Sequence, residues 1–318
     1  MSHGSRLFGR REFTISAGAV GLAALVGGRG AEAGLAAAPG IRIGYAAITW
    51  GDKSVKTAIG EIAEAGYPGI QLRGNITKDY QTPAELKADL DQAKLTFACL
   101  SGGGPSADPA KRQEEVDKFV KAVEFAKGAG VLAVQATSPK RTTDKIEKAE
   151  LESFADTLTA IGKKTAELGV PLVFHPHMAQ IGQDPADVEV ILKRSNPRYV
   201  KLLLDTGHWA AAGGDPVKAV KKYAKRIAVL HIKDVKDKEP STTPGPDGKI
   251  DTKKYVFVEL GQGKVDFKAV FAALKAARWK GWAVVELDSV PAGRAPKEAA
   301  VANRKFLESL GLSVLATT

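Results

Sequence analysis

The feature that most constrains this chain is a series of four short apolar runs that each end in a metal-binding type of side chain. The runs end in His175, Asp205, His231 and Glu286. Short apolar runs bounded by turn residues are typical of parallel strands buried on both faces. In a barrel of such strands the C-terminal ends meet at one face, so we expect the four side chains to come together there.

The rest of the chain from residue 41 onward alternates apolar runs with amphipathic helical stretches. Further strands are expected at 41–45, 69–73, 96–100 and 131–136. Strict alternation with short connections predicts a parallel sheet covered by helices. About eight strands and eight helices predict an α/β fold of the (β/α)8 TIM-barrel type. An open doubly wound sheet is less favoured, and no Gly-x-Gly-x-x-Gly follows the first strand.

The N-terminus is typical of an export signal. Arg10 and Arg11 precede a Gly/Ala-rich apolar stretch, and Ala31-Glu32-Ala33 fits a small-x-small cleavage site. A second candidate site ends at Ala38, and a disordered basic N-terminus is the alternative to a signal. We expect a twin-arginine signal peptide, a linker and a TIM-barrel catalytic domain over residues 1–33, 34–40 and 41–318. Export predicts a periplasmic protein, and no other stretch is long enough to span a membrane.

Composition narrows the classes of partner. The formal net charge is +10, but the lysines are spread along helical faces among Asp and Glu. This pattern favours a solvated surface, so nucleic acid is not expected as a partner, and an anionic surface is the alternative. Cys99 is the only cysteine, which excludes an intrachain disulfide, and its strand-like surroundings predict a small buried side chain.

The four strand-end residues form a donor set for a divalent metal ion. Imidazole with carboxylate suits Mn²⁺, Zn²⁺, Fe²⁺, Co²⁺ or Mg²⁺, and the sequence does not choose among them. A lone Asp at a strand end is equally well explained as a helix N-cap. A lone strand His is more often a hydrogen-bonded core residue. Four such residues at one depth are harder to explain by packing, so we predict a metal site.

Two further histidines lie close to this set. Strand alternation points His175 and His177 the same way, so either can be the first ligand. We place His175 in the metal shell because its depth matches the other three, and His177 one layer higher near the substrate. His208 follows Asp205 by three residues and is expected to contact substrate, orient a ligand or cap the following turn.

Other candidate substrate contacts lie at strand ends and in one long loop. Trp50 follows the first strand and can stack on a sugar or plug the barrel mouth. Arg73 ends the second strand and can hold a hydroxyl or carboxylate, or form a surface ion pair. Residues 233–263 form a long connection expected to overhang the active face, with a turn at 246–248 and a strand-like segment at 255–258.

Several motifs resemble the sugar phosphate isomerase/epimerase group of the xylose isomerase-like barrels, and the inosose dehydratase type is nearest in pattern. The motifs are Ile43–Gly51, His175–Met178, Leu203–His208 and Val229–Asp234. The resemblance spans about residues 41–310 and implies a metal-dependent barrel that acts on a sugar or polyol. The usual ligand set of the group is Glu, Asp, His and Glu. Its last three members fall on Asp205, His231 and Glu286.

The chain departs from this pattern at two positions. The first ligand is His175 instead of Glu, and Gln183 stands where relatives with His-Pro-His-Met commonly carry Glu. The second change removes a candidate base and leaves Gln183 as a candidate substrate contact. A histidine base, or one from the long loop such as Glu259, becomes the expectation. Lys233 of the His-Ile-Lys-Asp motif is a further catalytic candidate.

The expected chemistry is proton abstraction next to a carbonyl group of the substrate. Return of the proton gives an isomerase or epimerase, and loss of a β-substituent gives a lyase or dehydratase. Since an exported enzyme rarely meets phosphorylated sugars, we expect a keto-sugar, an inosose or a 3-keto-glycoside. The alternatives are a metal-dependent endonuclease-like barrel and a non-catalytic periplasmic sugar-binding protein. The sequence is compatible with a monomer or an oligomer.

Overall fold

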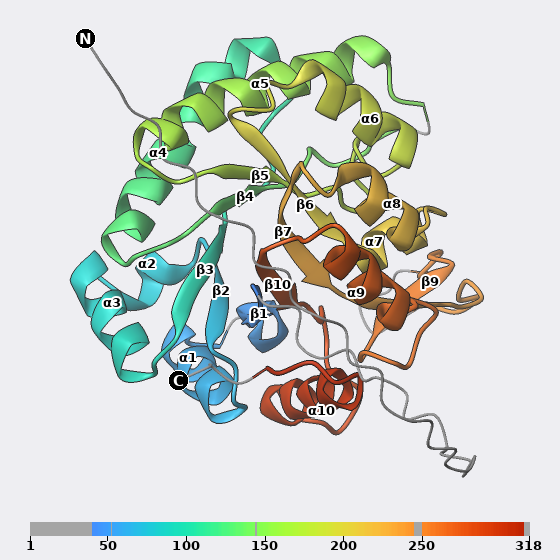
Figure 1. Cartoon of the computed structure of the whole chain (residues 1–318). Coiled ribbons are helices and arrows are strands. Elements are labelled where there is room, and N and C mark those ends of the chain that lie inside the picture. Colours follow the sequence, from blue (N-terminus) through green and yellow to red (C-terminus); the bar gives the residue numbers. More distant parts are fainter. Residues whose placement is uncertain (1–39, 52, 144, 245–249, 315–318) are drawn as a thin grey trace, which may run out of the picture. The chain divides into compact units, whose positions relative to one another are not determined.

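The computed structural model describes residues 40–51, 53–143, 145–244 and 250–314. Eight parallel strands in this part of the chain close into a barrel in the order β1-β10-β7-β6-β5-β4-β3-β2, and helices surround it (Figure 1). This arrangement confirms the predicted TIM barrel. The expected signal peptide, nearly all of the expected linker and the expected turn at 246–248 lie outside the described residues.

The barrel strands alternate with the helices along the chain. The strands are β1 (Ile41–Ala46), β2 (Gly69–Arg73), β3 (Thr96–Ser101), β4 (Val134–Ala136), β5 (Leu172–Phe174), β6 (Val200–Asp205), β7 (Ile227–Ile232) and β10 (Gly281–Val285). The α-helices are α1 (Val55–Glu64), α2 (Ile76–Asp79), α3 (Pro83–Gln92), α4 (Arg112–Gly128), α5 (Lys148–Glu167), α6 (Pro185–Arg194), α7 (Thr206–Ala211), α8 (Pro216–Tyr223), α9 (Phe267–Ala276) and α10 (Pro296–Ser309). Two 3₁₀ turns, η1 (Ala47–Trp50) and η2 (Pro109–Lys111), complete the set.

Local sequence signals set several of these boundaries. Thr82 and Glu85 form a capping box at the start of α3, where Pro83 is the first residue. Gly66 follows α1 with a φ of 87°, in the left-handed region that favours glycine. β5 begins at Leu172, after Pro171, because proline has no N–H to donate to a neighbouring strand.

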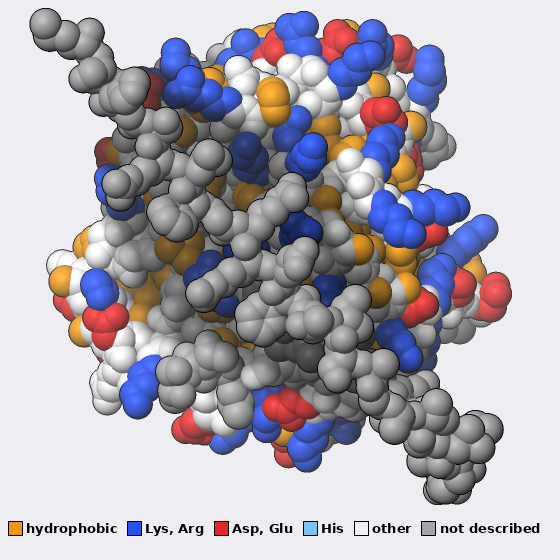
Figure 2. Space-filling view, viewed as in Figure 1, with side chains coloured by type: hydrophobic (Ala, Val, Ile, Leu, Met, Phe, Trp, Pro, Cys, Tyr) orange, Lys and Arg blue, Asp and Glu red, His pale blue; other side chains and the backbone are white. Residues whose placement is uncertain are grey.

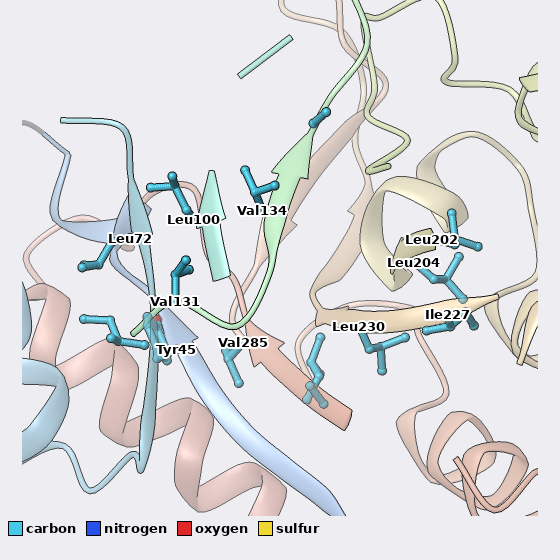
Figure 3. Packing of buried hydrophobic residues seen from close by; sticks show 14 of the residues in the cluster. Tyr45, Leu72, Leu100, Val131, Val134, Leu202, Leu204, Ile227, Leu230 and Val285 are labelled. Carbon is cyan, nitrogen blue, oxygen red and sulfur yellow. The ribbon is translucent and has the colours of Figure 1, made fainter. Parts of the chain in front are cut away.

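Side chains on the barrel strands alternate between two apolar layers. One layer lies between the strands and the helices, and Figure 3 shows Leu72, Leu100 and Leu230 among its members. The other fills the barrel interior and consists of Ala46, Ala98, Cys99, Ala133, Val173, Leu203, Val229, Trp282 and Val284. The barrel is therefore a packed core, with Cys99 fully buried in it as predicted.

The long connection after β7 is an ordered hairpin where it is described. β8 (Asp234–Asp237) pairs antiparallel with β9 (Tyr255–Val258). The carboxylate of Asp234 accepts hydrogen bonds of 2.8–3.1 Å from four backbone N–H groups, those of Val235, Gly261, Gly263 and Val265. These bonds tie the two ends of the connection together. A Cβ at Gly263 would lie 2.2 Å from Asp234 Oδ1, so this approach requires glycine.

The surface carries both signs of charge. Basic and acidic side chains are interspersed around the rim of the face in Figure 2. Lys118 pairs with Glu114 and Lys222 with Glu189, each at 2.8 Å, which matches the solvated helical faces expected from the sequence. Among the described residues, no helix is long and apolar enough to cross a membrane.

Candidate metal centre

The four predicted ligands all point into the barrel above its apolar filling. Each lies two residues after a member of the interior layer, so the period-two alternation of a strand directs it inward. The pairs are Val173 and His175, Leu203 and Asp205, Val229 and His231, and Val284 and Glu286. All four ligand candidates are at most 5% exposed.

Two of the distances from His231 to the other ligand candidates match the spacing around a divalent ion. His231 Nδ1 lies 3.4 Å from Asp205 Oδ2 and 3.3 Å from Glu286 Oε2. Ligand atoms at 2.0–2.2 Å from a tetrahedral ion are about 3.3–3.6 Å apart. The buried atoms His175 Nδ1, Asp205 Oδ2 and His231 Nδ1 have no hydrogen-bond partner among the described residues. Buried polar atoms are normally paired, so these residues fit a cation.

Asp205 combines both functions that a strand-end aspartate can have. Its Oδ1 accepts a 2.8 Å hydrogen bond from the N–H of His208 and caps α7. Its Oδ2 has no hydrogen-bond partner among the described residues and faces His231. The cap therefore fixes the carboxylate so that one oxygen remains available to an ion.

His208 lies beside the cluster but is already engaged. His175, Asp205, His208 and Glu286 each offer a ligand atom within 4.8 Å of the others. However, His208 Nδ1 accepts from the N–H of Met178 at 3.2 Å, and its Nε2 lies 3.2 Å from Lys233 Nζ. His231 Nδ1 has no such partner among the described residues, which favours His231 over His208 as the ligand from this side.

His177 is half-buried at the mouth of the site. Its ring lies against that of His208, with centroids 3.8 Å apart. Its Nδ1 is 2.7 Å from the carbonyl oxygen of Met178. Because a carbonyl oxygen only accepts, His177 Nδ1 carries the hydrogen, and in the neutral ring Nε2 keeps a free lone pair.

Lys233 is a buried cation that links the cluster to the mouth. Its Nζ donates to Glu286 Oε1 at 3.0 Å and to Asp288 Oδ1 at 2.6 Å, and it lies 4.3 Å from the centroid of the Phe257 ring. Burial opposes the charge of Lys233, but Glu286 and Asp288 outweigh burial and raise its pKa above the usual value. Glu286 thus has one oxygen on Lys233 and the other facing His231.

Burial and neighbouring charges favour the neutral forms of His175 and His208 and the ionised form of Glu286. Burial lowers the pKa of His175 well below its usual value, and His231 lowers it further. Burial and then Lys233 do the same for the pKa of His208. Burial raises the pKa of Glu286, but His231 and Lys233 outweigh burial and lower it below the usual value. Neutral imidazoles and an ionised carboxylate are the forms that bind metal ions.

Four other candidates have different partners in the structure. Trp50 is buried and its Nε1 donates to Glu61 at 2.6 Å, which fits the alternative of a plug at the barrel mouth. Gln183 Oε1 accepts from the N–H of Ala179 at 2.9 Å. Arg73 is exposed, and its Nη1 lies 3.5 Å from the carbonyl oxygen of Gly51. Glu259 pairs with Arg294 at 2.6 Å. Their proposed roles in substrate binding or catalysis stay predictions.

Sequence reasoning missed three residues that contact the cluster. Asp288 and Phe257 contact Lys233, and Gln71 contacts His231. Asp288 follows Glu286 by two residues, which is a usable signal because strand alternation points both the same way. Phe257 belongs to a segment with a strand-like pattern, but its position over Lys233 depends on the hairpin.

Comparison with known proteins agrees with the fold and the motifs. The sequence model of the xylose isomerase-like TIM barrel family matches residues 59–310. The chain belongs to this family. An inosose dehydratase of Lacticaseibacillus casei is 30% identical over 293 residues, covering 85% of this chain and 97% of that protein. Such relatives make this family member an enzyme of the sugar isomerase and dehydratase group.

Solved structures share the fold at lower sequence identity. The IOLI protein with a bound zinc atom superposes with a TM-score of 0.69 at 22% identity, covering 85% of this chain and 98% of that one. The 3-keto-D-glucoside 4-epimerase from E. coli superposes with a TM-score of 0.66 at 16% identity, covering 85% and 99%. At these low sequence identities, the structural similarity shows only that the proteins share a fold.

Proposed function

We propose that this enzyme binds one divalent metal ion and removes a proton next to the carbonyl of a keto-sugar, inosose or 3-keto-glycoside. The proposed ligands are His175, Asp205, His231 and Glu286. The observation that carries the proposal is the set of three buried ligand atoms at this face of the barrel that have no partner among the described residues. His175 is preferred to His177 because its Nδ1 belongs to this set, whereas that of His177 is bonded to Met178.

A divalent ion held there would polarise the substrate carbonyl and stabilise negative charge on its oxygen. His177 Nε2 is the proposed base, because it has a free lone pair at the mouth of the site. Lys233 donates to Glu286 and Asp288 and so holds the Glu286 carboxylate in place beside the proposed ion. Phe257 covers the Lys233 ammonium and keeps water from it.

We favour β-elimination as the outcome of proton abstraction. His177 takes the α-proton, the electron pair of the broken C–H bond forms the new C=C bond, and the β C–O bond breaks with its electron pair on oxygen. The departing oxygen takes up a proton and leaves as water, or as an alcohol when the substrate is a glycoside. The support is the 30% identity to an inosose dehydratase over nearly all of that protein's length. Epimerisation or isomerisation is the second candidate, because the 3-keto-D-glucoside 4-epimerase shares the fold.

We further propose that the enzyme works in the periplasm. The support is the twin-arginine pattern of Arg10 and Arg11 with the cleavage motif ending at Ala33. A periplasmic enzyme meets free keto-polyols and oxidised glycosides more readily than phosphorylated sugars. Replacing both arginines with lysine should keep the protein in the cytoplasm, and unchanged export would contradict this signal.

The reaction is tested by incubating the purified protein with Mn²⁺ or Zn²⁺ in D₂O. An inosose and a 3-keto-glycoside serve as substrates, and NMR follows deuterium uptake and product release. We expect deuterium exchange with loss of water or the aglycone, and no reaction for His177→Asn. Glu167→Gln, on a helix of the outer layer, is the matched control and should react as wild type does. No exchange and no product release with either ion would overturn the proposal.

A further inference from the structure

We infer that Gln71 is a positioning residue that fixes which ring nitrogen His231 presents to the metal site. The inference rests on the metal site proposed above. Gln71 lies in β2 and His231 in β7, two strands that are not neighbours in the barrel. Gln71 Oε1 nevertheless lies 2.9 Å from His231 Nε2, so the contact crosses the barrel interior.

The direction of the Gln71 amide follows from its other partners. Gln71 Nε2 donates to Ser101 Oγ at 3.0 Å and to Gln135 Oε1 at 2.9 Å. With both amide hydrogens used, only Oε1 is left to face His231. An amide oxygen only accepts, so His231 Nε2 must carry a hydrogen and donate it.

This hydrogen bond determines what His231 offers on its opposite side. With Nε2 bonded to Gln71, the ring directs Nδ1 between the carboxylates of Asp205 and Glu286. If the ring turned over, or if Nδ1 held the neutral ring's only hydrogen, the ion would lose this ligand. Partners that orient metal-binding histidines typically change metal affinity by about 10–100-fold when removed.

Burial makes this orientation strict. Gln71, Gln135 and His231 are all at least 95% buried, so water does not compete for the amide. Among the described side chains, the polar atoms of Gln71 are all paired, whereas His231 Nδ1 is not. The supporting network is therefore complete on one side of the ring and open on the side that faces the proposed ion.

The test compares a Gln71 variant that has no hydrogen-bond acceptor with one that keeps an acceptor, and both side chains are close to glutamine in length. Gln71→Met removes the oxygen, Gln71→Glu keeps an acceptor, and Gln113→Met on the exposed face of α4 is the matched control. Affinity for Co²⁺ and Mn²⁺ is measured by calorimetry on the full chain. We expect a loss of about 10–100-fold for Gln71→Met, a change within about threefold for Gln71→Glu, and none for the control.

A second readout needs no metal. ¹⁵N NMR of the histidine rings in the metal-free wild-type protein reports which nitrogen carries hydrogen, and we expect it on Nε2 of His231. Wild-type affinity in Gln71→Met, or His231 with hydrogen on Nδ1 alone, would overturn the inference. If Gln71→Met does not fold, Gln135→Met and the wild-type spectrum test the role of Gln71 in its place. If the wild-type protein binds no divalent ion, the proposed function fails, and the NMR spectrum still decides the role of Gln71.

Discussion

The two halves of the barrel place different side chains in the same interior. β5, β6, β7 and β10 direct bulky apolar residues inward, and the four candidate ligands lie at or next to their C-terminal ends. Except for Arg42, which lies over the Trp282 ring, the interior residues in or next to β1 to β4 are small or neutral polar, namely Gly44, Ala46, Gly69, Gln71, Ala98, Cys99, Ser101, Ala133 and Gln135. The first half of the chain therefore supports and fills the barrel, and the second half carries the charged donors.

The difference shows how one fold separates stability from chemistry. Among the ligand candidates, three buried polar atoms lack partners among the described residues, which costs stability unless a ligand pairs them. In the supporting half, small residues leave space for Trp282, whose ring lies where a Cβ of Gly69 would be. Substitutions of the ligands and of residues that contact them should thus change the reaction, and substitutions of the small filling residues in the supporting half should change folding without changing metal binding.

The largest effect is expected for Lys233→Met in the ligand half. It leaves Glu286 and Asp288 without their buried cation. Breaking one partner of a buried ion pair typically costs about 3–5 kcal/mol of unfolding free energy. Loss of the cation that holds the proposed ligand Glu286 in place should lower kcat by about 10–100-fold. Urea unfolding measures the free energy of unfolding and steady-state kinetics measures kcat. The surface substitution Lys264→Met is the control. Wild-type values for both would show that Lys233 is neither a structural nor a catalytic cation.

Asp234→Ala should have the next largest effect, at the base of the hairpin over the ligand half. It removes the acceptor of four backbone N–H groups. Because hydrogen bonds to charged groups are worth about 1.5–3 kcal/mol each, we expect a loss of at least about 3 kcal/mol. KM should rise as Phe257 loses its position. Urea unfolding and kinetics test this against Asp237→Ala, and a stability equal to that of this control would rule out the anchoring role.

Gly69→Ala tests the supporting half. The added Cβ would lie 2.2 Å from the Trp282 ring. Overpacking of this kind should cost about 1–3 kcal/mol of unfolding free energy while metal affinity stays unchanged. Gly60→Ala in α1 is the matched control, because nothing lies within 4 Å of its added Cβ, and it should be neutral or stabilising. If the Gly69→Ala protein folds but does not bind metal, the proposed separation of supporting and metal-binding residues is wrong.

The smallest effect is expected in the outer helices. Arg194 holds the pKa of Asp156 below its usual value through a 2.8 Å ion pair. In the unfolded chain the pKa of Asp is about 3.9. Because the pKa of Asp156 is lower in the folded protein, its carboxylate stabilises the fold at pH values above about 3.9. This stabilisation is lost as the pH falls through the folded-state pKa. The pair is partly exposed, so Asp156→Asn should cost at most about 1 kcal/mol at pH 7. Thermal unfolding from pH 7 to pH 2 should show the two proteins converging, and a constant gap would contradict the pairing.

The fold and the ligand candidates could be predicted because both depend on local patterns. Apolar runs, helix caps and the period of two lie within short stretches, and parallel strands bring their ends together. Gln71 could not be predicted, because its partner His231 is 160 residues away and a glutamine in a strand carries no signal of its own. β8 could not be predicted either, because Lys236 and Asp237 make that segment look like a solvated loop.

The central claim is that the second half of the barrel holds one divalent ion, and metal titration tests it most directly. Metal-free full-length protein is titrated with Zn²⁺ and with Mn²⁺ by calorimetry, beside Glu286→Gln and the surface control Glu167→Gln. We predict one ion per chain for the wild type and the control. Glu286→Gln should bind at least about tenfold more weakly, since it loses a charged ligand. Equal binding by all three proteins, or no binding by the wild type, would contradict the claim.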